Sequence, residues 1–330
     1  MKITVIKGDG ISGEVVDCAL RVLEAAGVNA QWEFFDAGEA VIATEGKPLN
    51  DKALASIERN KIAMKGPVAT PIGKGFRSVN VELRQKFDLY CNLRPSQNFD
   101  GIETRFKNVD LVVLRENTED LYMGIERMAD GDTAESVKRF TRKGCERIIR
   151  FAFEFAVKQG RKKVTAVHKA NIMKLTDGMF LDIAREVATE YPSIQFDEKI
   201  VDAMAMRLVT DPENFDVIVT SNLYGDILSD LCAGLVGGLG LAPSANIGKD
   251  IAIFEPVHGS APDIAGKGIA NPTATILAAC LMLRHVGMNG KAEKIESAVK
   301  AVLKEGKALT PDLKGSAGSW EFTEEVIKKF

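Results

Sequence analysis

Several features that would narrow the class of this chain are scarce or missing. The cysteines are five in number and widely spaced, with no C-x-x-C pair: Cys18, Cys91, Cys145, Cys232 and Cys280. An odd, scattered set indicates neither a disulfide framework nor a zinc knuckle. No apolar run approaches the roughly 18 to 20 residues that span a bilayer, since the nearest, 231–243, is interrupted by glycines. Repeats and low-complexity tracts are also missing.

The charge balance excludes a further class. With 43 basic and 46 acidic residues, there is no basic excess to hold nucleic acid. The N-terminus lacks the apolar region of a signal peptide, so we expect a cytoplasmic protein. A chain of 330 residues with 45% hydrophobic residues can fill the core of one large or two ordinary domains.

Short aliphatic runs alternate with longer amphipathic segments. This alternation predicts an α/β protein with a parallel-rich sheet covered on both faces. The expected strands are 3–6, 111–114, 164–167, 217–220 and 251–254, and the expected helices are 12–26, 139–159, 177–190, 273–285 and one that follows Asn222. Arg115, Lys169, Asn222 and His258 come where strands end, and ligands of open α/β sheets bind at the carboxyl ends of strands.

Arginines are concentrated between residues 77 and 122. If 77–87 is helical, Arg77, Asn80 and Arg84 share one face, and Arg94 and Arg115 each end a short apolar run that would deliver them to a sheet edge. Planar guanidinium groups suit carboxylates better than lysine does, so this set indicates a site for a small molecule rich in carboxylates. The alternative is a group of surface arginines paired with acids.

A glycine motif, Gly8-Asp9-Gly10-Ile11-Ser12-Gly13, follows the first expected strand and opens a helix. It formally satisfies the dinucleotide-binding fingerprint, with acidic residues about twenty positions later. The Asp9 carboxylate would lie close to a pyrophosphate and repel it. A tight strand-to-helix turn is therefore the preferred interpretation.

Two aspartates, Asp226 and Asp230, stand one turn apart on the helix that follows Asn222. Like charges at this spacing repel unless a cation lies between them, and oxygen ligands favour Mg²⁺ or Mn²⁺ over zinc. Asp202 could supply a third ligand. The alternative is that Asp226 caps the helix and Asp230 faces water.

Lys169 emerges at a strand end, where it is a candidate base toward a metal-bound hydroxyl, and Tyr122 could donate a proton at the same site. His168 is better interpreted as a structural histidine. The polar segment 126–139 is either an arm for a partner subunit or a loop.

With these pieces assembled, the chain resembles the β-hydroxyacid oxidative decarboxylases, the family of isocitrate, 3-isopropylmalate and homoisocitrate dehydrogenases. The resemblance runs from end to end and includes the segments 92–95, 115–122, 225–230 and 255–266. It implies the isopropylmalate dehydrogenase-like two-domain fold, with a parallel-rich mixed sheet that is not a Rossmann fold. Residues 1–98 and 238–330 would form the large, cofactor-binding domain, and 99–237 the small domain with the dimer interface and the metal ligands.

Carried over residue by residue, the resemblance assigns Arg84, Arg94 and Arg115 to the substrate carboxylates. Asp226 and Asp230, with the partner subunit's Asp202, would hold Mg²⁺ or Mn²⁺, the partner subunit's Lys169 would act as the base, and Tyr122 would protonate the product carbon. The active form would then be a homo-oligomer, a dimer or a dimer of dimers.

The resemblance also implies the cofactor and the substrate. The cofactor would lie on the loop His258, Gly259, Ser260, Ala261, Asp263 and Ile264, with Asn271 near the adenine and Thr70 and Asn222 toward the nicotinamide. An aspartate at 263 accepts ribose hydroxyls and repels a 2′-phosphate, so NAD is expected. By this resemblance, Ser78 and Asn80 would be the pair that hydrogen-bonds the γ-carboxylate of isocitrate. The expected reaction is thus NAD-dependent conversion of this tricarboxylate to 2-oxoglutarate and CO₂. The alternatives are homoisocitrate or 3-isopropylmalate dehydrogenase, or a non-catalytic regulatory subunit.

Overall fold

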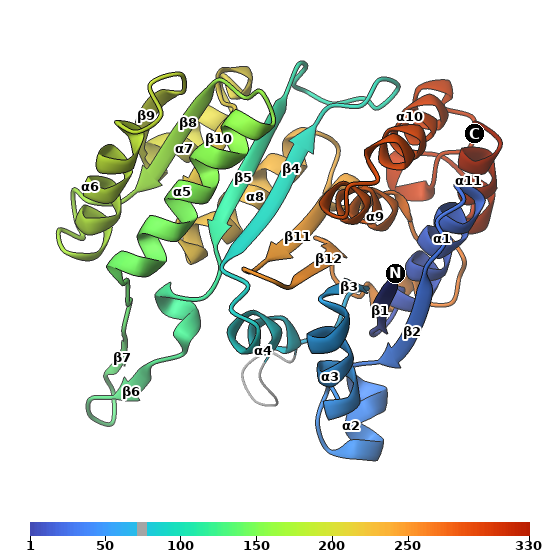
Figure 1. Cartoon of the computed structure of the whole chain (residues 1–330), viewed down its shortest axis with the longest axis horizontal. Helices are drawn as coiled ribbons and strands as arrows, with labels where there is room; N and C mark the ends of the chain where they lie inside the picture. The colour runs from blue at the N-terminus through green and yellow to red at the C-terminus, as the bar shows by residue number, and fades with distance from the viewer. Residues whose placement is uncertain (71–77) are drawn as a thin grey trace. The chain divides into compact units, whose positions relative to one another are not determined.

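The computed structural model describes residues 1–70 and 78–330 and divides into two compact units (Figure 1). Unit 1 contains Met1–Phe87, Asn98–Arg105 and Val236–Phe330, and unit 2 contains Asp88–Gln97 and Phe106–Leu235. Both chain ends therefore belong to unit 1, and unit 2 is built from the middle of the chain. The predicted functional domain boundaries remain a prediction.

The strands of unit 1 are ordered β2-β1-β3-β12-β11. Parallel pairing joins β1 to β2 and β3, and β3 to β12, whereas β11 and β12 form an antiparallel pair. The strands are β1 (Lys2–Lys7), β2 (Gln31–Asp36), β3 (Ile62–Lys65), β11 (Pro243–Ile247) and β12 (Ala252–Pro256). Strands β3 and β12 pair although they come from distant parts of the chain. The sheet of unit 1 is therefore completed only by the C-terminal half of the chain.

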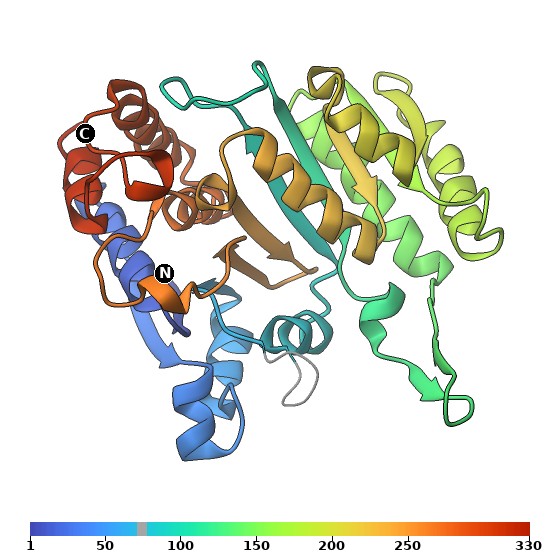
Figure 2. The same ribbon diagram turned by 180° about the vertical axis from the view of Figure 1, so that it is seen from behind.

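Helix α9 (Thr273–His285) packs on β3, β11 and β12 and is almost entirely buried. The other helices of unit 1 are α1 (Ser12–Ala25), α2 (Glu39–Glu45), α3 (Asp51–Asn60), α4 (Val79–Lys86), α10 (Asn289–Glu305) and α11 (Ser319–Ile327). The short 3₁₀ helices are η3 (Leu239–Leu241), η4 (Pro262–Ile264) and η5 (Pro311–Leu313). The first and last helices, α1 and α11, pack against each other (Figure 2).

Unit 2 has the strand order β4-β5-β10-β8-β9. Strands β5, β10, β8 and β9 run parallel to one another, and β4 runs antiparallel to β5. The bounds are β4 (Cys91–Gln97), β5 (Asp110–Glu116), β8 (Lys163–His168), β9 (Gln195–Ile200) and β10 (Val217–Thr220). All four residues of β10 are buried, as expected for a strand covered on both faces.

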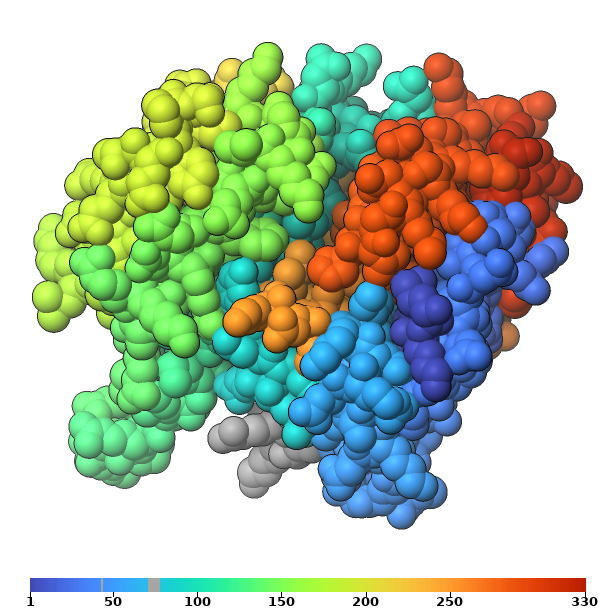
Figure 3. Space-filling model, viewed as in Figure 1, coloured from blue at the N-terminus to red at the C-terminus, as the bar shows by residue number. Residues whose placement is uncertain are grey.

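Helices cover both faces of this sheet, with α5 and α6 on one side and α7 and α8 on the other (Figures 1 and 2). They are α5 (Arg142–Lys158), α6 (Thr176–Ala188), α7 (Val201–Leu208) and α8 (Asn222–Leu235), with the 3₁₀ helices η1 (Asp120–Met123) and η2 (Pro212–Asn214). Strands β6 (Glu126–Met128) and β7 (Ala134–Ser136) form an exposed antiparallel hairpin. It stands out from unit 2 in Figure 3.

The predicted mixed, parallel-rich α/β architecture is confirmed. Two details were wrong: the helix predicted from 139 begins at Arg142, because Thr141 caps it through a side-chain bond to the Gly144 N–H, and Arg94 lies in the middle of β4 rather than at a strand end. Arg77 lies outside the described residues. Among the helices of residues 1–70 and 78–330, none combines the length and apolar character needed to cross a membrane.

Candidate active site

The two aspartates predicted to bind metal lie on α8, and the end of β5 faces them. Arg115 is the penultimate residue of β5 and is only 1% exposed. Its guanidinium forms an ion pair with Asp226. A Cβ at Gly225 would lie 2.5 Å from Arg115 Cγ, so the glycine before Asp226 creates the space through which the arginine passes.

The Arg115 side chain is held by one further partner and leaves one donor unused. Its Nε donates to Asn222 Oδ1 at 2.9 Å, and the Asn222 amide in turn donates to the carbonyl of Glu119 at 3.1 Å. Within the described residues, Arg115 Nη2 is buried without a hydrogen-bond partner. A buried donor without an acceptor is costly, so this atom is available to an anionic ligand.

A second guanidinium reaches the same helix from β4. Arg94 Nη1 lies 3.0 Å from Asp230 Oδ1 and 3.6 Å from Asp226 Oδ1, and it donates to Ser229 Oγ at 2.8 Å. Its Nε donates to Asn92 Oδ1 at 2.6 Å. Two arginines and two aspartates therefore converge in unit 2.

Tyr122 joins this cluster from η1. Its hydroxyl donates to Asp226 Oδ2, and the Arg115 guanidinium lies 4.9 Å from its ring centroid. Burial raises the pKa of the Asp230 carboxyl above its ordinary value, an effect that Arg94 opposes and Asp226 reinforces. A nearby cation would therefore favour the charged form of Asp230.

Lys169 and Asp202 form a separate pair. Lys169 directly follows β8, as predicted, and its Nζ forms an ion pair with Asp202 in the first turn of α7. A hydrogen bond from Lys169 lowers the pKa of Asp202. No group of three metal-ligating side chains forms within residues 1–70 and 78–330 of the single chain. The expected third ligand was assigned to a partner subunit, so a single chain does not test it.

In unit 1, Arg84 belongs to a buried polar network. Its Nε donates to Asn246 Oδ1 at 3.1 Å, and the Asn246 amide donates to Glu255 at 2.6 Å. Glu255 pairs with Lys65 at 2.7 Å, and both side chains are buried. Ser78 is the residue before α4, and Asn80 follows in its first turn. The Asn80 Oδ1 atom is buried without a partner among the described residues.

The predicted cofactor loop lies against the first glycine turn. Ile11 N donates to the Ser260 carbonyl at 2.9 Å, and a Cβ at Gly10 would lie 1.9 Å from that oxygen. The Asp9 carboxylate accepts from the backbone N–H groups of Glu39 and Ala69 at 2.9 and 2.8 Å. These contacts support the interpretation of the motif as a structural turn.

Within this loop, Ala261 has a left-handed backbone with φ 40°, which is uncommon for a residue with a side chain. Gly259 and Asp263 are exposed, and Ile264 packs on Ile11 and Val15. Burial lowers the pKa of His258, so its imidazole is neutral near pH 7.

The other predicted cofactor residues differ in exposure. Asn271 is buried and donates to Asp312 at 2.9 Å. Thr70 is exposed. The roles assigned to all of these residues remain predictions.

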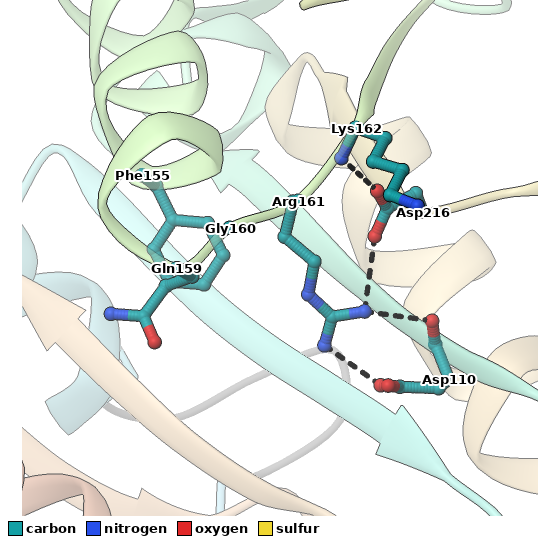
Figure 4. Close-up of a pocket in the computed structure, with 7 residues that line it drawn as sticks. All are labelled: Asp110, Phe155, Gln159, Gly160, Arg161, Lys162 and Asp216. Carbon is teal, nitrogen blue, oxygen red and sulfur yellow. Dashed lines mark hydrogen bonds and ion pairs between the residues drawn. The ribbon is translucent and has the colours of Figure 1, made fainter.

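A hollow of about 410 Å³ lies elsewhere in unit 2, between the end of α5 and the start of β5 (Figure 4). Arg161 in this hollow is paired with Asp110 at 2.7 Å and Asp216 at 3.0 Å. Its charge is thereby neutralised. Arg115 lies near the opposite end of β5, so this hollow is not the candidate active site.

The sequence interpretation missed the residues that hold the candidate groups in place, notably Asn92, Ser229 and Asn246. Each is a buried polar residue to which the resembling segments assigned no role, and Ser229 and Asn246 contact their arginines through the tertiary fold. The exception is Asn92, two residues from Arg94, where the strand spacing places both side chains on one face.

Comparison with known proteins places these residues in a family. A sequence model described as isocitrate/isopropylmalate dehydrogenase matches residues 2–329. The chain belongs to this dehydrogenase family. Its relatives in the family include the 3-isopropylmalate dehydrogenase of Archaeoglobus fulgidus, which is 51% identical over 98% of both chains. Another is a regulatory subunit of the mitochondrial NAD isocitrate dehydrogenase of Dictyostelium discoideum, which is 50% identical over 99% of this chain and 91% of its own.

A solved structure in the same family is similar throughout. The isocitrate dehydrogenase of Methylococcus capsulatus has a TM-score of 0.97 and 54% identity, covering 99% of this chain and 98% of its own. Relatives with different substrates are thus about equally similar to this chain. The fold and the dehydrogenase family are established, and the substrate must be argued from the site.

Proposed function

We propose that this chain is an NAD-dependent isocitrate dehydrogenase that converts isocitrate to 2-oxoglutarate and CO₂ with a divalent metal. The observation that carries the proposal is the convergence of Arg94 and Arg115 with Asp226 and Asp230 in unit 2. Two cationic and two anionic side chains in contact can bind an anionic substrate together with a metal cation. A carboxylate-rich substrate would take the guanidinium donors, and a divalent cation would take the aspartates.

The donor set of this chain fits such a cation. Asp226 and Asp230 supply only oxygen atoms and sit one helical turn apart, and oxygen ligands select Mg²⁺ or Mn²⁺. When bound, the ion would polarise the hydroxyl and carbonyl oxygens of the substrate. The partner subunit's Asp202 would complete the site.

Side chains of the chain and of its partner would move the protons. The partner subunit's Lys169, in its neutral form, accepts the proton of the substrate hydroxyl, directly or through water, as hydride passes to NAD⁺ and oxalosuccinate forms. Arg94 and Arg115 hold the carboxylates and fix the orientation. After CO₂ leaves, Tyr122 delivers a proton to the substrate carbon to give 2-oxoglutarate.

The choice of isocitrate rests on two polar residues before and within α4. Ser78 and Asn80 offer polar groups where an isopropyl group would leave them unpaired, and a site built of such groups rejects an apolar analogue strongly. The second candidate, 3-isopropylmalate, is favoured by the 51% identity to a relative named for that activity.

NAD is proposed over NADP because Asp263 is exposed on the cofactor loop. Its carboxylate can accept from ribose hydroxyls, whereas a 2′-phosphate would be repelled.

A homo-oligomer with shared active sites is proposed from the surroundings of Lys169. Ile172 and Leu175 follow it in the chain and are 68% and 87% exposed, and Met206 on α7 is 52% exposed. Large apolar side chains gathered beside an ion pair suit burial against a second copy. The proposal places this oligomer in the cytoplasm.

Steady-state rates with isocitrate, homoisocitrate and 3-isopropylmalate, each with NAD and NADP and with added Mg²⁺ or Mn²⁺, test this function. We expect NADH production with isocitrate to exceed the other rates and to disappear with a chelator. Lys169→Met should abolish turnover and leave assembly unchanged. A higher kcat/KM with 3-isopropylmalate would overturn the substrate assignment.

The same assay separates an enzyme from a non-catalytic regulatory subunit. The proposed catalytic and metal-binding residues, Tyr122, Lys169, Asp202, Asp226 and Asp230, are all present, which favours the enzyme. A purified single chain that produces no NADH with any substrate or metal would support the regulatory role instead.

A further inference from the structure

A buried ion pair lies directly behind the Lys169 segment. Asp177, in the first turn of α6, and Lys138, two residues after the hairpin, are paired at 2.7 Å with side chains only 1% and 13% exposed. The second carboxylate oxygen of Asp177 accepts the backbone N–H of Lys169 at 2.7 Å. An acidic residue at a helix start commonly accepts hydrogen bonds from the N–H groups of its own helix. Asp177 instead accepts one from Lys169, which precedes the helix.

The backbone of Lys169 is fixed on both sides of its Cα. The N–H of Lys169 donates to the Asp177 carboxylate. The carbonyl of Lys169 accepts hydrogen bonds from the backbone N–H groups of Ile172 and Met173, both at 2.9 Å. Only the side chain of Lys169 is left to extend toward Asp202. The Asp177 carboxylate and the turn that follows therefore set the position of the backbone from which the Lys169 side chain extends.

Lys138 holds this carboxylate in place through the ion pair. Its ammonium lies 4.3 Å from the ring centroid of Tyr224 and 4.7 Å from that of Phe140, and it donates to the Tyr224 hydroxyl at 3.2 Å. Tyr224 precedes Asp226 by two residues on α8, so the same pair ties the Lys169 segment to the helix that carries the proposed metal ligands.

We propose that Asp177 is a positioning residue for Lys169 and that Lys138 is the charge partner it requires. This inference rests on the proposed role of Lys169 as the base. Nothing reacts at Asp177 or Lys138. Their contribution is to hold the amine of Lys169 within reach of the substrate hydroxyl, and misplacement by about 1 Å can cost a reaction about 100-fold in rate.

Three variants test the proposal. Asp177→Ala removes the acceptor of the Lys169 N–H and leaves Lys138 buried without its partner. The double variant Asp177→Asn with Lys138→Met keeps an acceptor oxygen and removes both charges. Glu186→Gln is the matched control, because it breaks an exposed ion pair between α6 and Arg142 of α5.

The readouts are steady-state kinetics and hydrogen exchange of residues 169–173. For Asp177→Ala we expect kcat with isocitrate to fall by about 100-fold, with KM little changed and with faster exchange in 169–173. In the double variant, most of the kcat and most of the exchange protection should return, and the Glu186→Gln control should match the wild type. A purely structural pair would lower activity only in proportion to the folded fraction.

Wild-type kcat in Asp177→Ala, or unchanged exchange in 169–173, would overturn the inference. If Asp177→Ala does not fold, the double variant is the test. It keeps an acceptor for the Lys169 N–H, so a folded double variant whose kcat and hydrogen exchange in 169–173 are far from wild type would contradict the proposed role of Asp177. A wild type inactive with every β-hydroxyacid would instead contradict the proposed function. The exchange results alone would then support or overturn the hold of Asp177 on the Lys169 backbone.

Discussion

At the scale of single residues, the buried pair Lys65 and Glu255 has the clearest energetic consequence. Both side chains are almost fully buried, and Glu255 also accepts from Asn246, which holds Arg84. A buried charge that loses its partner is costly, whereas removing both charges together is often nearly neutral. The pair therefore matters more for keeping Arg84 in place than for net stability.

Lys65→Met should lower the free energy of unfolding by about 3 to 5 kcal/mol at pH 8, because it leaves the buried Glu255 carboxylate without the ammonium group that contacts it. The double variant with Glu255→Leu should recover most of that loss. Urea denaturation of both variants and the wild type measures the difference. Equal losses in the single and double variants would contradict the argument.

The same variants carry a pH dependence. Burial alone would raise the pKa of Glu255, but Lys65 and Arg84 outweigh it and hold the pKa below its ordinary value. The wild-type pair thus stabilises the fold above the unfolded pKa, and this contribution is lost as pH falls through the folded pKa. In Lys65→Met only the charge of Arg84 still opposes the effect of burial, so the carboxyl takes up a proton more readily. The deficit of the variant should therefore shrink from pH 8 to pH 5.

At the scale of elements, the start of α8 is fixed by η1. Asp120 is fully buried, has φ 72°, and accepts the N–H of Leu223 at 3.0 Å. One residue thus caps the helix that carries Asp226 and Asp230 and directs the chain toward Tyr122. The left-handed backbone at Asp120 is unfavourable for most side chains, and aspartate and asparagine tolerate it best after glycine.

Substitutions at Asp120 should separate capping from backbone conformation. Asp120→Asn keeps an acceptor and the tolerance of a left-handed backbone, so its stability should be close to wild type. Asp120→Gly should lose about 1 kcal/mol through the missing cap, and Asp120→Ala should lose about 1 kcal/mol more through backbone strain. Thermal unfolding would rank the stabilities of the three variants. An Asp120→Ala variant as stable as Asp120→Gly, or more stable, would contradict the strain assigned to the left-handed backbone at this position.

Elements with a strong hydrophobic period could be predicted from the sequence, and those fixed by their neighbours could not. The runs 164–167 and 217–220 were found because buried parallel strands are continuously apolar. Strand β4 has polar residues at 92 and 94, so nothing local indicated that Arg94 lies mid-strand. The segment 126–139 has no core pattern, and its hairpin depends on backbone pairing between β6 and β7.

At the scale of the whole molecule, the sequence indicated the charged residues of the candidate site but not the residues that hold them in place. Resemblance and charge chemistry indicated Arg115 and Asp226, which the structure brings together. Asp177 and Lys138 are 39 residues apart, and their pairing follows from how α6 packs beside α5. Contacts of this kind have no sequence period, so they appear only with the fold.

Unit 1 should respond as one cooperative structure to changes at the end of the chain. Phe322 on α11 is fully buried, and α11 packs on α1. Phe322→Ala should cost about 3 to 5 kcal/mol and speed hydrogen exchange in α1, some 300 residues earlier by sequence. Trp320→Ala, at a side chain that is 48% exposed, is the matched control. Unchanged exchange in α1 would contradict this coupling.

The order in which strands of unit 1 leave the ribosome has a consequence for biosynthesis. Strand β3 pairs on one side with β1 and on the other with β12, which is synthesised almost two hundred residues later. Residues 106–235 can acquire their own parallel sheet during translation, while the nascent N-terminal segment keeps an unpaired strand edge until the chain is nearly finished. That open edge is the stage at which chaperones have most to protect.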